Sequence, residues 1–284
     1  MGADRQGRAA IASVAFCVNA EKPRAFARRD ELAALAHRLG LRILAEGEAE
    51  VTVVLGGDGT ILRAVRAHPR VPVLGLNLGS LGYLASVEER DFARAVTMLA
   101  EGRYRLSRRS ALAVRRVGGP GGRRAAAAVA LNDIVVMREQ SGHAAVLDLA
   151  VDGRSASRYM ADGVVVATPT GSTAYSLSAG GPVLMPDADA FVVTPMNPHA
   201  LGVRPMVVPD AARLTVTSRR KVNGRAERIG VYADGESVLT LDGDETIEIR
   251  KAARSVPLVE LEGHDPYEVM ARKLGWSGAG GGRR

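Results

Sequence analysis

The sequence is poor in two kinds of residue that often reveal what a protein does. Of its 284 residues only Cys17 is a cysteine, and aromatic side chains make up 4% of the total. A single cysteine excludes an intrachain disulfide, so we expect a buried, unreactive thiol and a cytoplasmic protein. The scarcity of aromatic rings argues against binding of single-stranded nucleic acid, which relies on stacking of the bases.

Positive charge is in excess, but it is not concentrated. The formal net charge is +7, and arginine pairs are spread along the chain without forming one basic stripe. We therefore expect no nucleic-acid partner, because a small phosphorylated substrate explains the basic balance equally well. The uncharged stretch 163–186 contains prolines, glycines and hydroxyl residues, which excludes a membrane-spanning helix, and no membrane partner is expected.

Several common catalytic patterns are also absent. No GxxxxGK[ST] phosphate loop occurs, and the stretch from Gly57 has Leu62 where a dinucleotide fingerprint requires its third glycine. No serine lies in a GxSxG elbow, which argues against a serine hydrolase. The five histidines lack metal-ligand spacing, so a structural zinc site is not expected.

The most informative stretch is 51–60, an apolar run that ends in three glycines around one carboxylate. Val51 to Leu55 is nearly continuous in its hydrophobicity, as expected of a strand that is buried on both faces of a parallel sheet. Glycines allow backbone N–H groups to approach a ligand, and Thr60 is expected to N-cap a helix that begins at Ile61. Because N–H groups at the start of a helix favour an anion, this turn predicts a phosphate site.

Asp58 is the one charged residue in this turn. A carboxylate beside a phosphate is repelled unless it holds a cation or accepts a proton from the attacking group. Both roles belong to phosphoryl transfer, in which a positioned base contributes about 10²- to 10⁴-fold. We therefore interpret Asp58 as a catalytic base, and a solvated aspartate in a tight turn is the alternative.

The pattern of strands and helices changes near residue 100. Before it, strands alternate with helices, which predicts a doubly wound α/β domain over 1–100. After it, short apolar runs predict a β-rich, sandwich-like domain over 101–255, followed by a helix and tail over 256–284 that pack back on the first domain. The hairpin signals in the second part are Asp152-Gly153, Asp162-Gly163, Asn223-Gly224, Asp234-Gly235 and Asp242-Gly243.

Two further stretches contain more glycine and hydroxyl residues than folding requires. The first, 75–84, places polar and glycine residues at the carboxyl edge of the predicted parallel sheet, where such sheets bind ligands. The second, 162–181, is a strand followed by threonines and serines, which suit hydrogen bonds to a ribose. The residues expected to bind phosphate are Gly56, Gly57, Gly59, Thr60, Asn77 and Gly79.

Together these stretches resemble a bacterial NAD kinase. The resemblance extends from Ile11 to about Trp276 and rests on Gly56-Gly-Asp-Gly-Thr60, Asn77-Leu-Gly79, Asn132-Asp133 and the segment from Asp162 to Gly181. It implies phosphorylation of the 2′-hydroxyl of the adenosine ribose of NAD by ATP or polyphosphate, giving NADP. It also implies an N-terminal α/β domain, a C-terminal β-domain, a divalent metal ion such as Mg²⁺, and a homodimer or homotetramer.

The resemblance assigns roles to single residues. Asp58 matches the family's proton acceptor, and Arg63 lies near the phosphates. Asn132 and Asp133 match its ribose-binding pair, and Tyr175 lies beside the base or the nicotinamide. The residues implied to contact NAD are Asp58, Gly59, Arg63, Asn132, Asp133, Asp162, Thr173, Ala174, Tyr175, Ser176, Leu177 and Ser178. No metal ligand is assigned.

Two positions depart from the family's pattern, and two alternatives remain open. Glu236 stands where many members have Gln, and Asn197 stands where a Cys is common. Diacylglycerol and sphingosine kinases carry a similar GGDGT signature, but the polar stretch 162–181 does not suit a lipid tail. A dinucleotide-sensing protein would bind without catalysis and would have no need of Asp58.

Overall fold

The computed structural model describes residues 10–79, 82–85, 87–117, 128–140, 144–220 and 227–276. They belong to two compact units, an α/β unit within 1–108 and 256–284 and a β unit within 109–255. The strand β6 (Tyr104–Arg109) joins the sheet of the α/β unit, so the division lies near residue 108 and not at residue 100.

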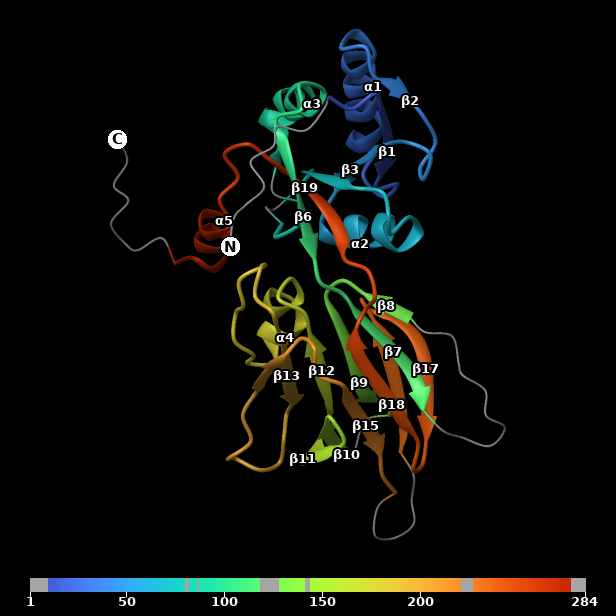
Figure 1. Cartoon of the computed structure of the whole chain (residues 1–284), viewed down its shortest axis with the longest axis vertical. Coiled ribbons are helices and arrows are strands. Elements are labelled where there is room, and N and C mark those ends of the chain that lie inside the picture. The colour runs from blue at the N-terminus through green and yellow to red at the C-terminus, as the bar shows by residue number, and fades with distance from the viewer. Residues whose placement is uncertain are drawn as a thin grey trace. The chain divides into compact units, whose positions relative to one another are not determined.

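A seven-stranded sheet forms the centre of the α/β unit. Its order is β2-β1-β3-β4-β19-β6, and β5 pairs with β4 (Figure 1). The pairings β1–β2, β1–β3, β3–β4, β4–β5 and β4–β19 are parallel. Every residue of β3 and β4 is buried, which agrees with their predominantly apolar sequences. The other strands besides β6 are β1 (Ser13–Val18), β2 (Arg42–Ile43), β3 (Val51–Gly56), β4 (Val73–Asn77), β5 (Val87–Glu88) and β19 (Val256–Leu261).

Helices cover both faces of this sheet. Helices α1 (Pro23–Arg38) and α3 (Phe92–Ala100) contact each other on one face, and α2 (Asp58–Ala67) packs against β3 and β4 on the other (Figure 1). A 3-10 turn, η1 (Glu89–Asp91), precedes α3, and the chain returns from the β unit to this unit through β19 and α5 (Pro266–Leu274). The doubly wound arrangement predicted from the alternation of strands and helices is confirmed.

The β unit consists of two antiparallel six-stranded sheets. Their orders are β11-β10-β15-β18-β7-β8 and β14-β13-β12-β9-β16-β17. Side chains from both sheets, including Leu147 and Phe191, form one apolar core, so the sandwich predicted from the short strands is confirmed. The strands are β7 (Leu112–Val117), β8 (Ala128–Ala130), β9 (Asp133–Arg138), β10 (Ala145–Val151), β11 (Arg154–Ala161), β12 (Gly163–Ala167), β13 (Ala190–Met196), β14 (Met206–Pro209), β15 (Leu214–Ser218), β16 (Arg228–Ala233), β17 (Glu236–Asp242) and β18 (Thr246–Lys251).

The Asp-Gly pairs of this unit do two different things. Asp152-Gly153 and Asp234-Gly235 form hairpin turns, between β10 and β11 and between β16 and β17. Asp162-Gly163 and Asp242-Gly243 instead lie where the chain passes from one sheet to the other, so the hairpins predicted there are wrong. In both kinds of connection the chain changes direction sharply, and an Asp-Gly pair indicates such a change of direction without specifying which kind it is. The pair Asn223-Gly224 lies outside the described residues.

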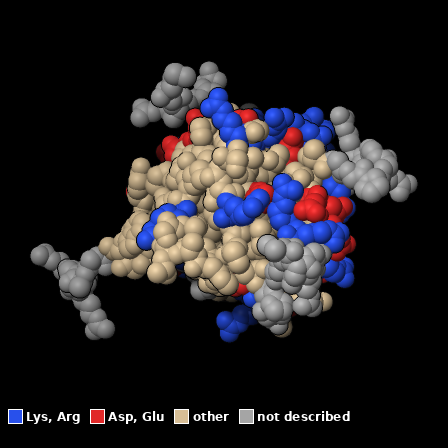
Figure 2. Space-filling view, turned by 90° about the horizontal axis from the view of Figure 1, so that it is seen from below, with Lys and Arg blue, Asp and Glu red and all other residues tan. Residues whose placement is uncertain are grey.

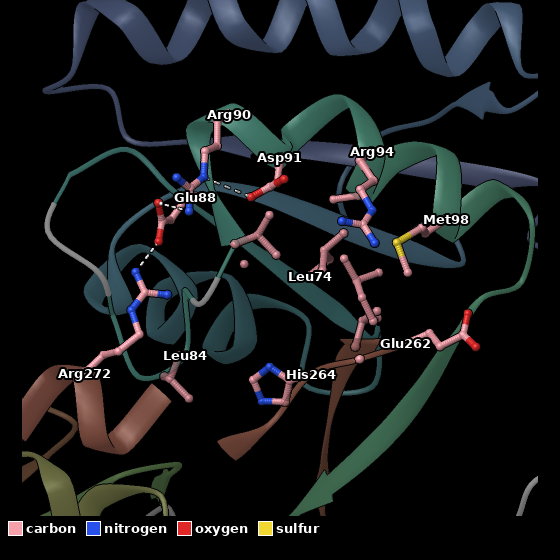
Figure 3. A pocket seen from close by; sticks show the side chains of 16 residues that line it. Leu74, Leu84, Glu88, Arg90, Asp91, Arg94, Met98, Glu262, His264 and Arg272 are labelled. Carbon is pink, nitrogen blue, oxygen red and sulfur yellow. Dashed lines mark hydrogen bonds and ion pairs between the residues drawn. The ribbon is translucent and has the colours of Figure 1, made fainter. Parts of the chain in front are cut away.

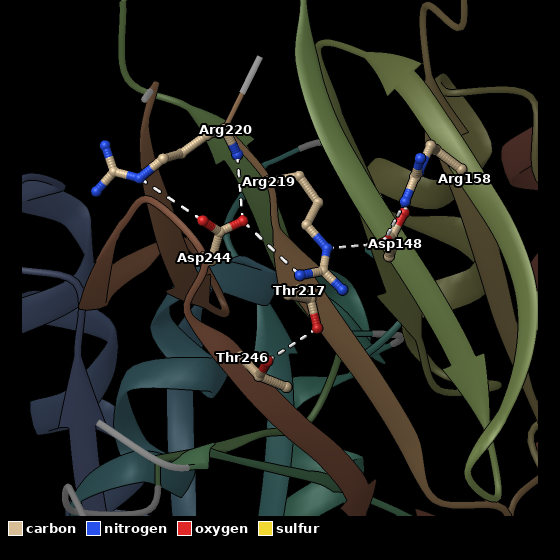
Figure 4. A network of polar contacts seen from close by, with 7 residues as sticks. All are labelled: Asp148, Arg158, Thr217, Arg219, Arg220, Asp244 and Thr246. Carbon is tan, nitrogen blue, oxygen red and sulfur yellow. Dashed lines mark hydrogen bonds and ion pairs between the residues drawn. The ribbon is translucent and has the colours of Figure 1, made fainter. Parts of the chain in front are cut away.

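Charged side chains on the β unit pair with one another. On the face drawn in Figure 2, basic and acidic side chains lie side by side over one part, and another part is largely uncharged. One such network joins Asp148 to Arg158 and Arg219, and Arg219 to Asp244, across neighbouring strands (Figure 4). The hydrogen bond from Arg158 is the main cause that lowers the pKa of Asp148 to about 2. None of the described helices combines the length and the apolar character needed to cross a membrane.

Candidate active site

The Gly-Gly-Asp-Gly-Thr turn connects β3 to α2. The helix begins at Asp58 with Gly57 as its N-cap, so the prediction that Thr60 caps a helix starting at Ile61 is wrong. Thr60 is buried in the first helical turn, beneath Gly56. The earlier start is favourable because the carboxylate of Asp58 then lies at the positive end of the helix dipole. The free N–H groups of this helix start are therefore those of the turn itself.

The three glycines of the turn differ in the space that surrounds them. A Cβ at Gly56 would overlap the side chain of Thr60, so packing within the unit explains this glycine. A Cβ at Gly57 or Gly59 would meet no described atom within 4 Å. Neither residue has positive φ, and Gly57 is a favourable N-cap, so both positions leave room for a ligand to approach the backbone.

Three consecutive backbone N–H groups hold the carboxylate of Asp58. Tyr83 donates to Oδ2 over 2.9 Å, and Leu84 and Ala85 each donate to Oδ1 over 3.0 Å. Gly82 precedes them, and a Cβ at this position would overlap Asp58 Oδ1. Because Oδ2 accepts one hydrogen bond and Oδ1 two, Oδ2 keeps an acceptor direction for another donor. Asp58 is partly exposed, so this direction is open to a substrate.

Polar groups gather at the carboxyl ends of β1, β3 and β4. Asn77 is buried, and its side-chain amide makes two hydrogen bonds to the backbone of Gly79, which closes a tight turn. Lys22 Nζ donates to the carbonyl of Leu78 over 3.1 Å, and Arg63 donates to the carbonyl of Val18 over 2.9 Å. Carbonyl oxygens neutralise neither cation, so both remain able to attract an anion.

Cys17 lies on β1 near these groups and is buried. Its burial, together with the neighbouring carboxylate of Glu46, raises the pKa of the thiol to about 11. The thiol is therefore neutral and unreactive at physiological pH, as its apolar sequence context predicts.

In the β unit, a second carboxylate accepts three consecutive backbone N–H groups. Asp234 accepts them from Leu131, Asn132 and Asp133, over 2.8, 2.7 and 3.3 Å. Asp234 sits in the β16–β17 hairpin turn with φ of 48°, a conformation that aspartate tolerates better than most residues. Its side chain thereby fixes the backbone of the Asn132-Asp133 pair.

Each side chain of the Asn132-Asp133 pair carries a buried polar group in an unusual state. The pKa of Asp133 is raised to about 7, first by burial and then by the charge of Asp234, while a backbone hydrogen bond from Tyr175 opposes the shift. Asn132 Oδ1 is buried and has no hydrogen-bond partner in the part of the chain that the structure describes. An acceptor without a partner, next to a buried carboxyl group, is suited to hydroxyl groups of a ligand.

The hydroxyl-rich segment after β12 is tied to the same pair. Thr168 donates its hydroxyl to the carbonyl of Leu131 over 2.6 Å, and a Cβ at Gly171 would overlap the carbonyl of Asn132. Ser172 and Ser176 are buried and hydrogen-bonded within the unit. The segment continues through η2 (Gly171–Thr173) and α4 (Tyr175–Ser178), where Tyr175 is 42% exposed. Most of these hydroxyls therefore build the loop, and the surface left for a ligand is around Tyr175.

Asp162 lies away from the Asn132-Asp133 pair. Strand β12 places Ala167 opposite Asp133 and Gly163 opposite Met137, so Asp162 precedes the other end of the strand. Its carboxylate binds Arg138 over 2.7 Å and the side-chain amide of Asn197 over 2.9 Å. These bonds, the one from Asn197 first, lower the pKa of Asp162. Within the β unit the structure does not bring Asp162 together with the Asn132-Asp133 pair.

Comparisons with known proteins agree with this arrangement. Residues 14–104 match the family model described as the ATP-NAD kinase N-terminal domain, and residues 131–261 match the ATP-NAD kinase C-terminal domain. NAD kinase from Symbiobacterium thermophilum is 37% identical over 92% of this chain and 98% of its own length. NAD kinase from Gemmatimonas aurantiaca is 36% identical over 85% of this chain and 83% of its own. The chain belongs to the NAD kinase family.

Solved NAD kinase structures have the same fold. An NAD kinase from Archaeoglobus fulgidus in complex with ATP aligns with a TM-score of 0.73 at 25% identity, covering 93% of this chain and 96% of the archaeal one. Yeast NADH kinase complexed with NADH aligns with a TM-score of 0.87, covering 97% and 90%, and its identity of 23% supports the fold alone.

Sequence reasoning missed three features of this NAD kinase site. The N–H groups of 83–85 carry no side-chain signal, and Lys22 is separated from the glycine-rich turn by many residues. Asp234 is visible in sequence only as half of an Asp-Gly turn. Among the described residues, no three His, Cys, Asp or Glu side chains form a group that is able to hold a metal ion.

Proposed function

We propose that this NAD kinase transfers the terminal phosphoryl group of ATP or polyphosphate to the 2′-hydroxyl of the adenosine ribose of NAD, giving NADP. The observation that carries the proposal is the carboxylate of Asp58, which three backbone N–H groups hold beside a glycine turn at a helix start. The names of the bacterial relatives and the ATP and NADH of the two solved relatives support the substrate class.

Asp58 is proposed as the general base. Its Oδ2 atom would accept the proton of the 2′-hydroxyl while the ribose oxygen forms its bond to the terminal phosphorus and the bond to the leaving phosphate breaks. A fixed base at this position avoids reorganisation during the reaction, and such positioning is most of what a kinase contributes. The hydrogen bonds from Tyr83, Leu84 and Ala85 supply that fixation.

The phosphates are proposed to lie against the turn and the edge of the parallel sheet. Gly57 and Gly59 would let them approach the N–H groups at the start of α2, and Arg63 and Lys22 would add positive charge. The buried Thr60 and the closed Asn77–Gly79 turn would act mainly by shaping this edge. Gly56 contributes by allowing Thr60 to pack beneath it.

The dinucleotide is proposed to bind the β unit through the Asn132-Asp133 pair and the surface around Tyr175. Asn132 Oδ1 would accept from one ribose hydroxyl and Asp133 from another, which satisfies the buried acceptor and favours the ionised carboxylate. We retain Gly59, Asp162 and the residues Thr173 to Ser178 as NAD contacts in this proposal.

A divalent metal ion such as Mg²⁺ is proposed to accompany the phosphates. In kinase sites Mg²⁺ keeps several waters and is held largely by substrate phosphates with one or two carboxylates, so a cage of protein side chains is not required. When bound, the ion would neutralise charge on the donor phosphates.

We further propose a homodimer or homotetramer in the cytoplasm. Among the apolar side chains that the β unit exposes are Met160 at 53%, Leu201 at 92% and Val207 at 50%. Val207 lies on the edge strand β14, and the carbonyl of Met160 accepts the N–H of His199, so Met160 lies next to the chain that leads to Leu201. Exposed apolar residues on a sheet edge suit contact with a second copy. The buried, unpaired Cys17 suits a reducing compartment.

One assay tests the activity and the donor together. The purified protein is incubated with NAD, Mg²⁺ and either ATP or polyphosphate, and NADP is detected with an NADP-specific dehydrogenase. We expect NADP with at least one donor, and NADH in place of NAD tests the redox state of the acceptor. Tight NAD binding without any NADP would indicate a dinucleotide sensor, and phosphorylation of a lipid in place of NAD would indicate the other kinase class.

A further inference from the structure

The α/β unit contains a cavity on the side of its sheet where α3 and α5 lie. Its volume is about 280 Å³, and its walls come from β4, β5, α3, β19 and α5 (Figure 3). We call it the α3–α5 cavity. Leu74, Leu84, Met98 and Val259 give part of its wall an apolar character, and polar groups contribute the larger share of its surface. A space of this size, near the lower limit for ligand pockets, suits a small molecule that combines a charged group with a compact apolar part.

Most charges around the cavity neutralise one another. Glu88 binds both Arg272 and Arg90, and Asp91 also lies within ion-pair distance of Arg90. The hydrogen bond from Arg272 is the main cause that lowers the pKa of Glu88, so this pair is ionised at neutral pH. Glu262, on the opposite wall, pairs with Arg103 over 2.9 Å.

Arg94 is a charged residue of the cavity whose charge is not neutralised in this way. It lines the cavity from α3 and makes no ion pair or hydrogen bond with any residue in the described part of the chain. In Figure 3 its guanidinium points from the helix toward the space that His264 faces from the other side. Arg94 is exposed, and its planar guanidinium, beside a partly apolar wall, matches the carboxylate of a small organic anion.

The cavity touches the loop that holds Asp58. Leu84 lines the cavity with its side chain, and the N–H of the same residue donates to Asp58 Oδ1 over 3.0 Å. The neighbouring Tyr83, which donates to Oδ2, also packs under the ammonium of Lys273 of α5, 5.4 Å from its ring centre. A ligand that packs against Leu84 would therefore change the freedom of the loop that positions Asp58.

We propose that the α3–α5 cavity is an effector site for a small monocarboxylate with a compact apolar body, held by Arg94, and that its occupation alters turnover through Leu84 and the Asp58 loop. Binding at this site is independent of the proposed kinase reaction, whereas the effect on turnover rests on that reaction.

Benzoate is the probe and benzamide, which has the same ring without the charge, is the matched control ligand. Binding to the full-length protein is measured by ligand-observed NMR, without NAD or ATP. We expect benzoate to bind and benzamide to bind about tenfold more weakly. Arg94→Met should weaken benzoate about tenfold, while Arg70→Met, at an exposed arginine outside the cavity, should leave it unchanged. Equal binding of benzoate to both variants would overturn the site.

The second measurement is NADP formation at saturating substrates with and without benzoate. We expect a change of about fivefold in turnover for the wild type and Arg70→Met, and none for Arg94→Met, whose basal turnover should be normal. The Leu84→Ala variant should still bind benzoate, but benzoate should change its turnover by a smaller factor than it changes the turnover of the wild type. Binding without any change in wild-type turnover would overturn the coupling. If benzoate binds as expected but no NADP forms at all, the kinase proposal fails and the site stands.

Discussion

Asp58 in the α/β unit and Asp234 in the β unit make the same pattern of hydrogen bonds with different consequences. Each carboxylate accepts three consecutive backbone N–H groups, from 83–85 in one case and from 131–133 in the other. Asp58 stands at the start of a helix, and no described residue is placed to use the open side of Oδ2. Asp234 stands in a hairpin turn next to a second carboxylate, Asp133, whose pKa it raises.

The difference shows that the surroundings decide what such a carboxylate does. At Asp58 the N–H groups fix a carboxylate in the turn that we propose to bind phosphate, which is why we propose it as the base. At Asp234 the N–H groups belong to the residues proposed to bind ribose, so the carboxylate acts on the position of its neighbours. A substitution at the first site should therefore lower turnover most, and a substitution at the second should weaken NAD binding and stability.

The largest effect is expected for Asp58→Asn. The amide is a poor base, and it offers only one acceptor oxygen to three N–H groups, so we expect turnover to fall about 100-fold or more. The melting temperature and the NAD affinity, both measured by calorimetry, show how much of the lost turnover comes from disturbance of the loop 83–85 that binds Asp58. Gly82→Ala is the matched variant, because it displaces the carboxylate without removing it and should cost about tenfold. Turnover of Asp58→Asn within about threefold of wild type would exclude a base at this position.

Asp234→Asn should act on NAD binding and on the fold. All three N–H groups lose a charged acceptor, and at least one of them then faces the amide nitrogen, so we expect a loss of about 1–3 kcal/mol in unfolding free energy and about tenfold in NAD affinity. Turnover at saturating NAD should change little. Asp152→Asn is the control, because Asp152 has the same turn conformation with φ of 50°, but its carboxylate accepts, among the described residues, only the N–H of Arg213. Equal effects of the two substitutions would show that Asp234 serves only its turn.

Asp133→Asn should change how stability depends on pH. The pKa of Asp133 is raised from 3.8 to about 7, so between these values the folded protein binds more protons than the unfolded chain. Stability therefore falls as pH rises from 4 through 7, and the variant should not show this part of the decline. We expect Asp133→Asn to be more stable than wild type by about 2 kcal/mol at pH 8, and nearly equal at pH 4, in urea denaturation. A variant that is less stable at pH 8 would contradict the burial argument.

Asp148→Asn should give the smallest effect, with the opposite dependence on pH. Its pKa is lowered to about 2, so its contribution to stability is present above 3.8 and is lost as pH falls toward 2. We expect a loss of about 1 kcal/mol at pH 7 that disappears near pH 2, because Arg158 and Arg219 are 67% and 42% exposed and water screens them. NADP formation should not change, since this network lies on the sheet that does not contain Asp133 (Figure 4).

The sequence by itself determined the local features of this protein. The apolar run of β3 and the glycines after it predict a buried parallel strand and a ligand-binding turn, and both are properties of adjacent residues. The order of such stretches also identifies the family. The sequence determined the hairpin turns at Asp152 and Asp234 because two residues with positive φ are favoured by Asp-Gly.

Only the tertiary structure decided which distant groups meet. Asp58 binds N–H groups 25 to 27 residues away, Asp234 binds N–H groups 101 to 103 residues away, and Glu88 pairs with Arg272 across 184 residues. The position of Asp162 at the far end of β12, and the passage of the chain between sheets at two of the Asp-Gly pairs, are decided in the same way. Local sequence sets backbone preference and periodicity, but backbone N–H groups are chemically alike, so strand order and chain crossings alone select which of them a carboxylate binds.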